Sequence, residues 1–441
     1  MKKNEYGLFT AIGMIVGIVI GSGIFFKSDN ILVATNGSIS LGVIVFCIAA
    51  LGIIFGSLTI SELASRESRP GGIITYAEYS YNESVACAFG WFHTFLYYPT
   101  LIAVVSWVAG IYVCMLFEID GGLALNIAIG FAFIVIFYIL NILSGKLGGY
   151  FQNISTVIKV IPLILIALAG VFFGNPSVIN ISDVTHMKSA TWMAAIAPIA
   201  FSFDGWIIAT SIGHEIKDSK KNLPKALVVA PLFILIIYVL YFVGISIYVG
   251  PERIMALEDA HVNLAANMLF GAWGAKIILT FVVVSILGAL NGLIMGHIRM
   301  PYSLAIRGMF PKSGKIKIVN EKLGIPIYSA IIAFIITIVC LIIHYITQKN
   351  NYLPNTDVSE ISVTVNYLLY ILLYFKVFRM GLSGEVKGIW KGKLNPILAS
   401  VGSLIIFFGS LTNPLFLVYL AICGTILLAA IIFWKFKEKS I

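Results

Sequence analysis

Four residues that could do chemistry lie inside long apolar stretches of the chain, where charged and helix-breaking residues are rare. Gly21 and Gly23 are in the first stretch, Lys159 is in the fifth, and Asp204 is in the sixth. A glycine in a helix interior costs roughly 1 kcal/mol relative to alanine, so the first helix is expected to open there. Opened backbone at bilayer depth is tolerated only where protein, water or a ligand satisfies its N–H and C=O groups. The first stretch therefore predicts a binding site built from backbone.

The glycines of the first stretch also fit a second interpretation. Gly13, Gly17 and Gly21 recur every four residues, as on a small-residue face that packs closely against another helix. A second break elsewhere would favour the binding site, and the sixth stretch supplies one, because Asp204 and the glycine after it interrupt an apolar helix. Breaks in the first and sixth helices are the arrangement expected of inverted repeats that hold a substrate between two unwound segments near the midplane.

The two charged side chains at membrane depth each allow a structural and a functional interpretation. A charge there costs at least about 2–3 kcal/mol unless it is paired or hydrated, so Lys159 is a functional candidate by default. A lysine near the inner end of its helix could instead snorkel to the interface. Asp204 could bind a ligand, or could cap the N–H groups freed by its own helix break. The residues alone leave both questions open.

Membrane-spanning helices must position these residues. The chain has 441 residues, of which 59% are hydrophobic and 11% are charged, against about 25% charged residues in a soluble domain. Apolar stretches long enough to span a bilayer recur throughout, so residues 1–441 are expected to form one all-α, polytopic transmembrane domain. Twelve spans are predicted, at residues 7–27, 38–63, 82–117, 121–143, 152–174, 191–212, 225–249, 270–304, 325–347, 359–379, 395–412 and 414–435.

The charge distribution orients these helices. The net charge is +9, but most of the 29 lysines and arginines fall in alternate loops, and few, such as Lys27 at the start of a short polar loop, fall in the others. This pattern predicts a multi-pass plasma-membrane protein with both termini in the cytoplasm, and it explains the basic excess without nucleic acid. The five cysteines show no CxxC or Cys/His spacing, so no metal site, disulfide framework or cofactor is expected.

The motifs around these residues resemble those of the amino acid–polyamine–organocation superfamily, most closely its L-type amino acid transporter branch and the bacterial exchangers of that branch. The family pattern G-S-G-I-F is similar to Gly21-Ser22-Gly23-Ile24-Phe25. Other matching motifs are Pro70-Gly71-Gly72 with Tyr76, Phe201 to Trp206 followed by Glu215 and Asn222-Leu223-Pro224, and Asn291-Gly292 with Arg299. The resemblance runs from about residue 7 to residue 435.

The resemblance implies a fold and an activity. The fold would be a 5+5 inverted-repeat (LeuT-type) arrangement of twelve helices with helices 1 and 6 unwound, whose repeats lie at about 7–174 and 191–379 and whose last two helices lie at 395–435. The activity would be sodium-independent transport of small neutral L-amino acids such as alanine, serine or threonine, by exchange and alternating access. The location would be the cytoplasmic membrane of a bacterium.

The resemblance also implies a role for each residue at the breaks. The backbone of Gly21, Ser22 and Gly23 would receive the α-carboxylate of the substrate. The α-ammonium would bind carbonyl groups at the two breaks, those of Ile18, Val19, Ile20, Phe201, Ser202, Phe203 and Asp204. Phe201 would also close over the substrate as the outer gate. Open backbone suits a zwitterion, since it offers N–H groups to an anion and C=O groups to a cation.

Four further residues form an expected coupling and gating network. Lys159 falls where the branch carries a lysine in place of a sodium ion, bridging the first and eighth helices near Gly17 and Ser285. Tyr238 falls near a seventh-helix tyrosine that supports the same network. The network is therefore expected to stabilise the broken first helix without a bound metal.

Alternatives remain at this point. Asp204 could pair with a cationic amino acid or a polyamine instead of a neutral substrate. A channel, which should pass substrate without counter-substrate, and a transporter-like receptor, which should carry a soluble signalling extension, are less favoured. An enzyme is less favoured still, because no nucleophile–base or metal-ligand spacing occurs at membrane depth. The loop at 118–122 has no cysteine with which to form a disulfide to an ancillary subunit, so no such partner is expected.

Overall fold

The computed structural model describes residues 7–143, 145–179, 190–353, 356–412 and 415–438, and every regular element in these ranges is helical. The longer helices of the first part are α4 (Ile39–Ala64), α6 (Glu83–Phe92), α7 (Tyr98–Leu116), α8 (Gly122–Leu143) and α9 (Gly145–Phe173). Those of the second part are α11 (Ser219–Val249), α13 (His261–Ile306), α15 (Ile327–Lys349), α16 (Ser359–Leu382), α17 (Asn395–Gly409) and α18 (Phe416–Glu438). Shorter helices include α3 (Ser28–Ala34), α5 (Ile73–Ser80), α12 (Pro251–Leu257) and α14 (Ser313–Ile316).

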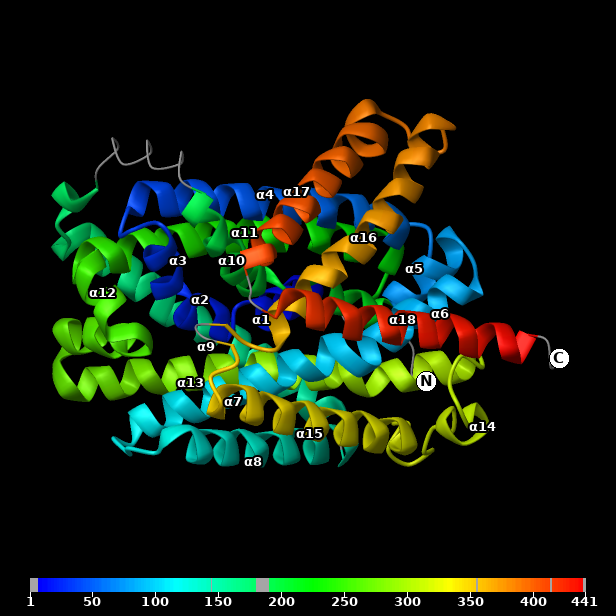
Figure 1. Ribbon diagram of the computed structural model, residues 1–441, viewed down its shortest axis with the longest axis horizontal. Coiled ribbons are helices and arrows are strands. Elements are labelled where there is room, and N and C mark those ends of the chain that lie inside the picture. The colour runs from blue at the N-terminus through cyan, green and yellow to red at the C-terminus, as the bar shows by residue number, and fades with distance from the viewer. Residues whose placement is uncertain (1–6, 144, 180–189, 354–355, 413–414, 439–441) are drawn as a thin grey trace.

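The long helices form one bundle around the first helix. In Figure 1, α4, α11, α13, α15 and α8 run roughly along the longest axis, and α1 (Leu8–Val19) lies near the middle. Helix α1 packs against α9, α11 and α13. Most of its second half is buried, as expected for an apolar helix enclosed by other helices rather than by lipid.

By length and composition, eleven helical segments of the described residues could cross a membrane, against twelve predicted. The difference is the first predicted span, residues 7–27, which the structure divides into α1 and α2 (Ser22–Phe26). Each piece is too short to span alone, because a span needs about 20 residues. The other segments match the predicted ones closely. Helix α13 begins earlier than predicted, but it bends at Gly271, which has φ 66°, so its later part corresponds to the predicted span at 270–304.

Both predicted helix breaks are present. Helix α1 ends at Val19, Ile20 is extended (φ −72°, ψ 95°), and Gly21 has φ −142° and ψ −134° before α2 begins. The second break was predicted within 202–205, and α10 (Ile196–Phe203) ends just before Asp204. Gly205 there has φ 98°, a left-handed conformation that favours glycine, and a 3₁₀ segment follows (Trp206–Glu215). The two breaks therefore come from the residues that sequence reasoning named.

Candidate transport site

The two breaks lie against each other. A Cβ placed on Gly23 would lie 2.5 Å from Ser202 Cα, and one on Gly21 would lie 2.6 Å from Ala289 Cβ on α13. Glycine is thus required at both positions by close approach of another segment, in addition to the helix break. The small-residue face is also present in part: a Cβ on Gly17 would collide with Thr156 of α9, whereas one on Gly13 would lie 3.9 Å from the same side chain.

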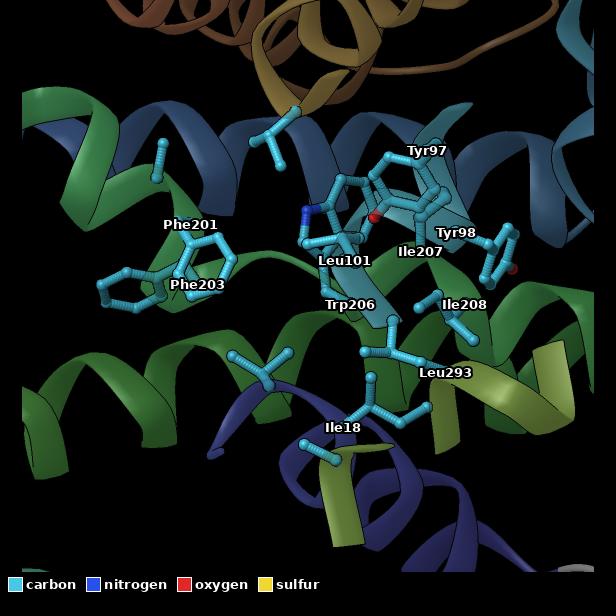
Figure 2. Close-up of a cluster of buried hydrophobic side chains, with 14 of the residues drawn as sticks. Ile18, Tyr97, Tyr98, Leu101, Phe201, Phe203, Trp206, Ile207, Ile208 and Leu293 are labelled. Carbon is cyan, nitrogen blue, oxygen red and sulfur yellow. The ribbon is translucent and has the colours of Figure 1, made fainter. Parts of the chain in front are cut away.

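A cavity with about 330 Å³ of empty space is lined by residues of both breaks. Its lining comes from α1, α2, α7, α10 with its break, and α13, and consists of Ile18, Val19, Gly21, Gly23, Leu101, Val105, Phe201, Asp204, Gly205, Ala289 and Leu293. In the view of Figure 2, Phe201 and Leu101 lie above Ile18 and Leu293. Six of the ten predicted substrate residues, including the aspartate, thus line one small and mostly apolar space. The side chain of Ser22 lies outside the described residues.

Phe201 and Phe203 are two residues apart in the chain, but their side chains contact different parts of the structure. Phe201 lines the cavity, whereas Phe203 packs against Tyr238, with ring centroids 5.0 Å apart, and against Phe46. Figure 2 shows both rings at the end of α10. Of the two, Phe201 has the position that a gate over the cavity requires.

Several carbonyl groups at the breaks already accept hydrogen bonds from side chains. The Tyr238 hydroxyl of α11 lies 3.0 Å from the carbonyl oxygens of both Val19 and Ser202. The Ser285 hydroxyl of α13 donates more weakly to the carbonyl of Ile20, at 3.4 Å. Each carbonyl has a second lone pair, so these bonds orient the carbonyls without using up their capacity to accept a bond from a ligand.

Lys159 joins the first helix to the rest of the bundle. Its side chain is wholly buried, and Nζ donates to the carbonyl oxygen of Gly17, in the turn just before the break. A Cβ on Gly288 would lie 3.1 Å from Nζ, so the glycine on α13 makes room for the ammonium. Lys159 therefore lies between the first and eighth predicted helices, as the resemblance implied, and does not snorkel. Ser285 contacts Ile20 in the same region.

Asp204 directly follows the last residue of α10. Its carboxyl group accepts a hydrogen bond from a residue that was not predicted from the sequence. Tyr97 donates a hydrogen bond of 2.6 Å to Asp204 Oδ2, while Oδ1 has no hydrogen-bond partner among the described residues. Tyr97 ends a π-helical turn, His93–Tyr97, which precedes α7. Such turns often occur at functional sites, since the extra residue redirects the side chains around it. A π-helical turn is not recognisable from a single sequence.

Other contributors to the cavity were also missed. Leu101 and Val105 on α7 and Ala289 and Leu293 on α13 are ordinary apolar residues of apolar helices. Nothing in one sequence shows which face of such a helix turns inward. The small size of Ala289, opposite Gly21, is the sole local signal.

One charged cluster was not predicted from the sequence, which placed Lys27 at the start of a short polar loop; the structure places it at a bend between α2 and α3. Lys27 Nζ lies 3.0 Å from Asp357 Oδ2 and 3.0 Å from Glu360 Oε1, and all three side chains are buried. Nζ also lies 5.4 Å from the centroid of the Phe201 ring. We call Lys27, Asp357 and Glu360 the Lys27 cluster. Its acidic members come from more than 300 positions away, so no local pattern around Lys27 indicates the cluster.

The cavity continues away from the Lys27 cluster. A second cavity shares Ile18 with the first and includes Gln152 and Ser211. A third, with about 530 Å³ of empty space, shares Ser211 with the second and includes Arg299 and Tyr302 at the end of α13. These cavities lie in series from the two breaks toward the end of the bundle that carries Arg299.

Two broken helices that face one small buried cavity, in an all-helical membrane protein, define a secondary transporter with a central substrate site. The chain belongs to the amino acid permease family, whose model matches residues 6–439. This match confirms the resemblance found in the motifs, and it confirms the expectation of a transporter rather than an enzyme.

Three relatives show where in this family the chain lies. The serine/threonine exchanger SteT of Bacillus subtilis is 28% identical over 414 residues, which cover 93% of this chain and 91% of the relative. The large neutral amino acids transporter small subunit 2 of Homo sapiens is 25% identical, over 88% of this chain and 70% of the relative. The b(0,+)-type amino acid transporter 1 of Mus musculus is 28% identical, over 66% of this chain and 60% of the relative.

Proposed function

We propose that the protein exchanges small neutral L-amino acids, such as alanine, serine and threonine, across the membrane without sodium. The observation that carries this proposal is the pair of backbone breaks on either side of one small, mostly apolar cavity. The N–H groups of Gly21, Ser22 and Gly23 begin a helix and suit a carboxylate, whereas carbonyls at the end of α10 and α1 suit an ammonium. The similarity to a serine/threonine exchanger over most of both chains supports the same substrates.

Sodium independence follows from Lys159 in this proposal. Its ammonium occupies the space between α1 and α13 and binds the carbonyl of Gly17. A fixed positive charge there orders the backbone before the break, a task that a bound cation could otherwise perform. A sodium ion beside the ammonium would be repelled. Lys159, Gly17, Tyr238 and Ser285 therefore act as one coupling network around the first break.

The proposal includes a topology and an orientation. The inverted repeats are residues 7–174 and 191–379, with the last two helices at 395–435, and both termini are in the cytoplasm. The Arg299 end of the bundle is then the inner end, and the Lys27 cluster lies at the outer end. The protein works in the lipid bilayer of the plasma membrane, the bacterial cytoplasmic membrane, without a disulfide-linked subunit. The excess of lysine and arginine in alternate loops supports this orientation.

A cationic substrate is the second candidate. Oδ1 of Asp204 has no hydrogen-bond partner among the described residues, and the residue lines the cavity, so a substrate ammonium or guanidinium could bind there. The apolar remainder of the lining and the small volume favour a neutral side chain. A polyamine would also lack the carboxylate that the Gly21 break suits.

Trans-stimulated uptake tests the proposal. Purified protein in proteoliposomes should take up labelled serine several-fold faster when the vesicles contain unlabelled serine or threonine than when they are empty. Replacing external sodium by potassium should leave the rate unchanged. Uptake that does not depend on internal amino acid would indicate a channel or uniporter, and stimulation by arginine without serine would favour the cationic substrate. Either result overturns the proposal.

A further inference from the structure

The Lys27 cluster places one ammonium between two carboxylates in the protein interior. Lys27, Asp357 and Glu360 have side chains that are 2%, 1% and 5% exposed, and both ion pairs measure 3.0 Å. If all three groups are ionised, one negative charge is left over. An uncompensated buried charge is strongly unfavourable, and a carboxyl group in that position takes up a proton instead.

The cluster lies over the gate of the central cavity. Lys27 follows α2 and contacts the Phe201 ring at 5.4 Å from its centroid, while Glu360 lies in the first turn of α16. The cluster therefore ties the outer part of the broken first helix to α16. A substrate that enters the cavity from this end requires these elements to separate, and separation would expose both carboxyl groups to water.

We propose that the Lys27 cluster is a proton-binding outer gate, in which Glu360 holds a proton while the gate is closed and releases it to external water when the gate opens. On opening, the O–H bond of the Glu360 carboxyl breaks, its electron pair stays on the carboxylate, and the proton passes to water. Closure reverses the step. That this gate faces the outside of the cell rests on the orientation proposed above.

Hydrogen bonding identifies Glu360 rather than Asp357 as the proton carrier. Asp357 accepts from Lys27 at Oδ2 and from the backbone N–H of Ser359 at Oδ1, 2.9 Å away. Bonds to both oxygens favour the charged form. Burial would raise the pKa of Asp357, but Lys27 and Ser359 lower it overall. Glu360 precedes the apolar span Ser362–Leu382, and burial raises its pKa to about 7, with Asp357 adding to the rise and Lys27 opposing it.

Other titratable groups surround the cluster and must be separated from Glu360 by experiment. His344 of α15 and Tyr419 of α18 interact with Asp357. Asp29, two residues after Lys27, interacts with Lys27 and with His261 of α13. Histidine is the side chain that ordinarily titrates near neutrality, so both are competing explanations of a pH dependence. A substitution at Glu360 itself distinguishes the proposal from both.

The sign of the pH effect follows from the two states. In the open gate Glu360 is hydrated and has the ordinary glutamate pKa of about 4.3. In the closed gate its pKa is higher, so the carboxyl group keeps its proton up to a higher pH. The closed gate binds more protons, so acid stabilises it and opening becomes easier as the external pH rises. With a closed-state pKa of about 7, the open population should be about tenfold lower at pH 6 than at pH 8.

Cysteine labelling from outside the cell measures gate opening without reference to any substrate. Leu101→Cys places a thiol in the central cavity, where a membrane-impermeant maleimide arrives from outside only through an open outer gate. Asp120→Cys, in an exposed loop, reports the reagent's own pH dependence, and the parent protein gives the background of the native cysteines. The normalised Leu101→Cys rate should be about tenfold lower at external pH 6 than at pH 8.

Two further variants decide the role of Glu360. Glu360→Gln keeps the shape of the protonated side chain, so labelling should be equally slow at both pH values. Glu118→Gln alters an acid of an exposed ion pair with Lys276 and should keep the parental pH dependence. The proposal is overturned if Glu360→Gln keeps the tenfold difference, if the parental rate is flat, or if Asp120→Cys reacts while Leu101→Cys does not react at either pH. None of these outcomes depends on whether serine is the substrate.

Discussion

The hydroxyl of Tyr238 lies 3.0 Å from the carbonyl oxygen of Val19, the last residue of α1. The same hydroxyl lies 3.0 Å from the carbonyl of Ser202, so one side chain on α11 bridges the two helix breaks. A break in each of two helices makes a useful site only if the breaks keep a fixed separation. Tyr238 is the residue best placed to fix it.

Tyr238→Phe should reduce exchange by roughly twofold to tenfold, because a buried hydrogen bond contributes about 0.5–1.5 kcal/mol. The matched control is Tyr241→Phe, since the Tyr241 hydroxyl is buried on the same helix and makes no hydrogen bond among the described residues. Initial rates of serine exchange per folded protein measure both. Equal rates for the two variants would show that Tyr238 acts only as a packing residue.

Lys159→Met should leave the protein folded but lower exchange by about tenfold or more, because the apolar side chain cannot hold the carbonyl of Gly17. Thr156→Val is the matched control. It removes a hydrogen bond of 3.1 Å from the same helix to the carbonyl of Gly13, one turn further from the break. Thermal unfolding in detergent checks folding. Unchanged turnover in Lys159→Met would reduce the lysine to a structural role.

Phe201→Ala should reduce exchange more than Phe203→Ala, because Phe201 lines the cavity and Phe203 packs between Tyr238 and Phe46. Phe203→Ala should instead lower the thermal stability, since removing a buried aromatic ring costs about 3–5 kcal/mol. Exchange rates are compared after correction for the folded fraction. Equal corrected rates would mean that the gate lies on the other face of α10.

Gly23→Ala should abolish most exchange, because its methyl group would meet the backbone of Ser202 at 2.5 Å and push the two breaks apart. Gly424→Ala is the control: a methyl group there meets nothing within 4 Å, and alanine favours helix α18 by about 1 kcal/mol. Substrate protection against heat unfolding provides a second measurement. Full activity in Gly23→Ala would show that the α2–α10 contact is dispensable.

The parts of the site that could be predicted are those whose residue types conflict with their surroundings. Gly21, Asp204 and Gly205 are poor residues for the middle of an apolar helix, and both breaks lie at them. Lys159 is costly at membrane depth, and its ammonium is indeed bound to the first helix. Such conflicts with local preference tend to mark functional positions.

The parts that could not be predicted depend on how helices face one another. Leu101 and Leu293 line the cavity, yet they resemble the lipid-facing leucines of other helices. The burial of Lys27 could not be predicted, because its two carboxylate partners follow it by 330 and 333 positions in the chain. The first span, residues 7–27, divides into α1 and α2 at the break that its own glycines indicated.

Competition by blocked serine derivatives tests most directly the central claim that backbone at the two breaks binds a zwitterion. L-Serine methyl ester lacks the carboxylate, and N-acetyl-L-serine lacks the ammonium, while both keep the side chain. We predict that neither inhibits exchange of labelled serine at a hundredfold excess, whereas alanine and threonine do. Inhibition by either derivative as strong as that by alanine would contradict the account.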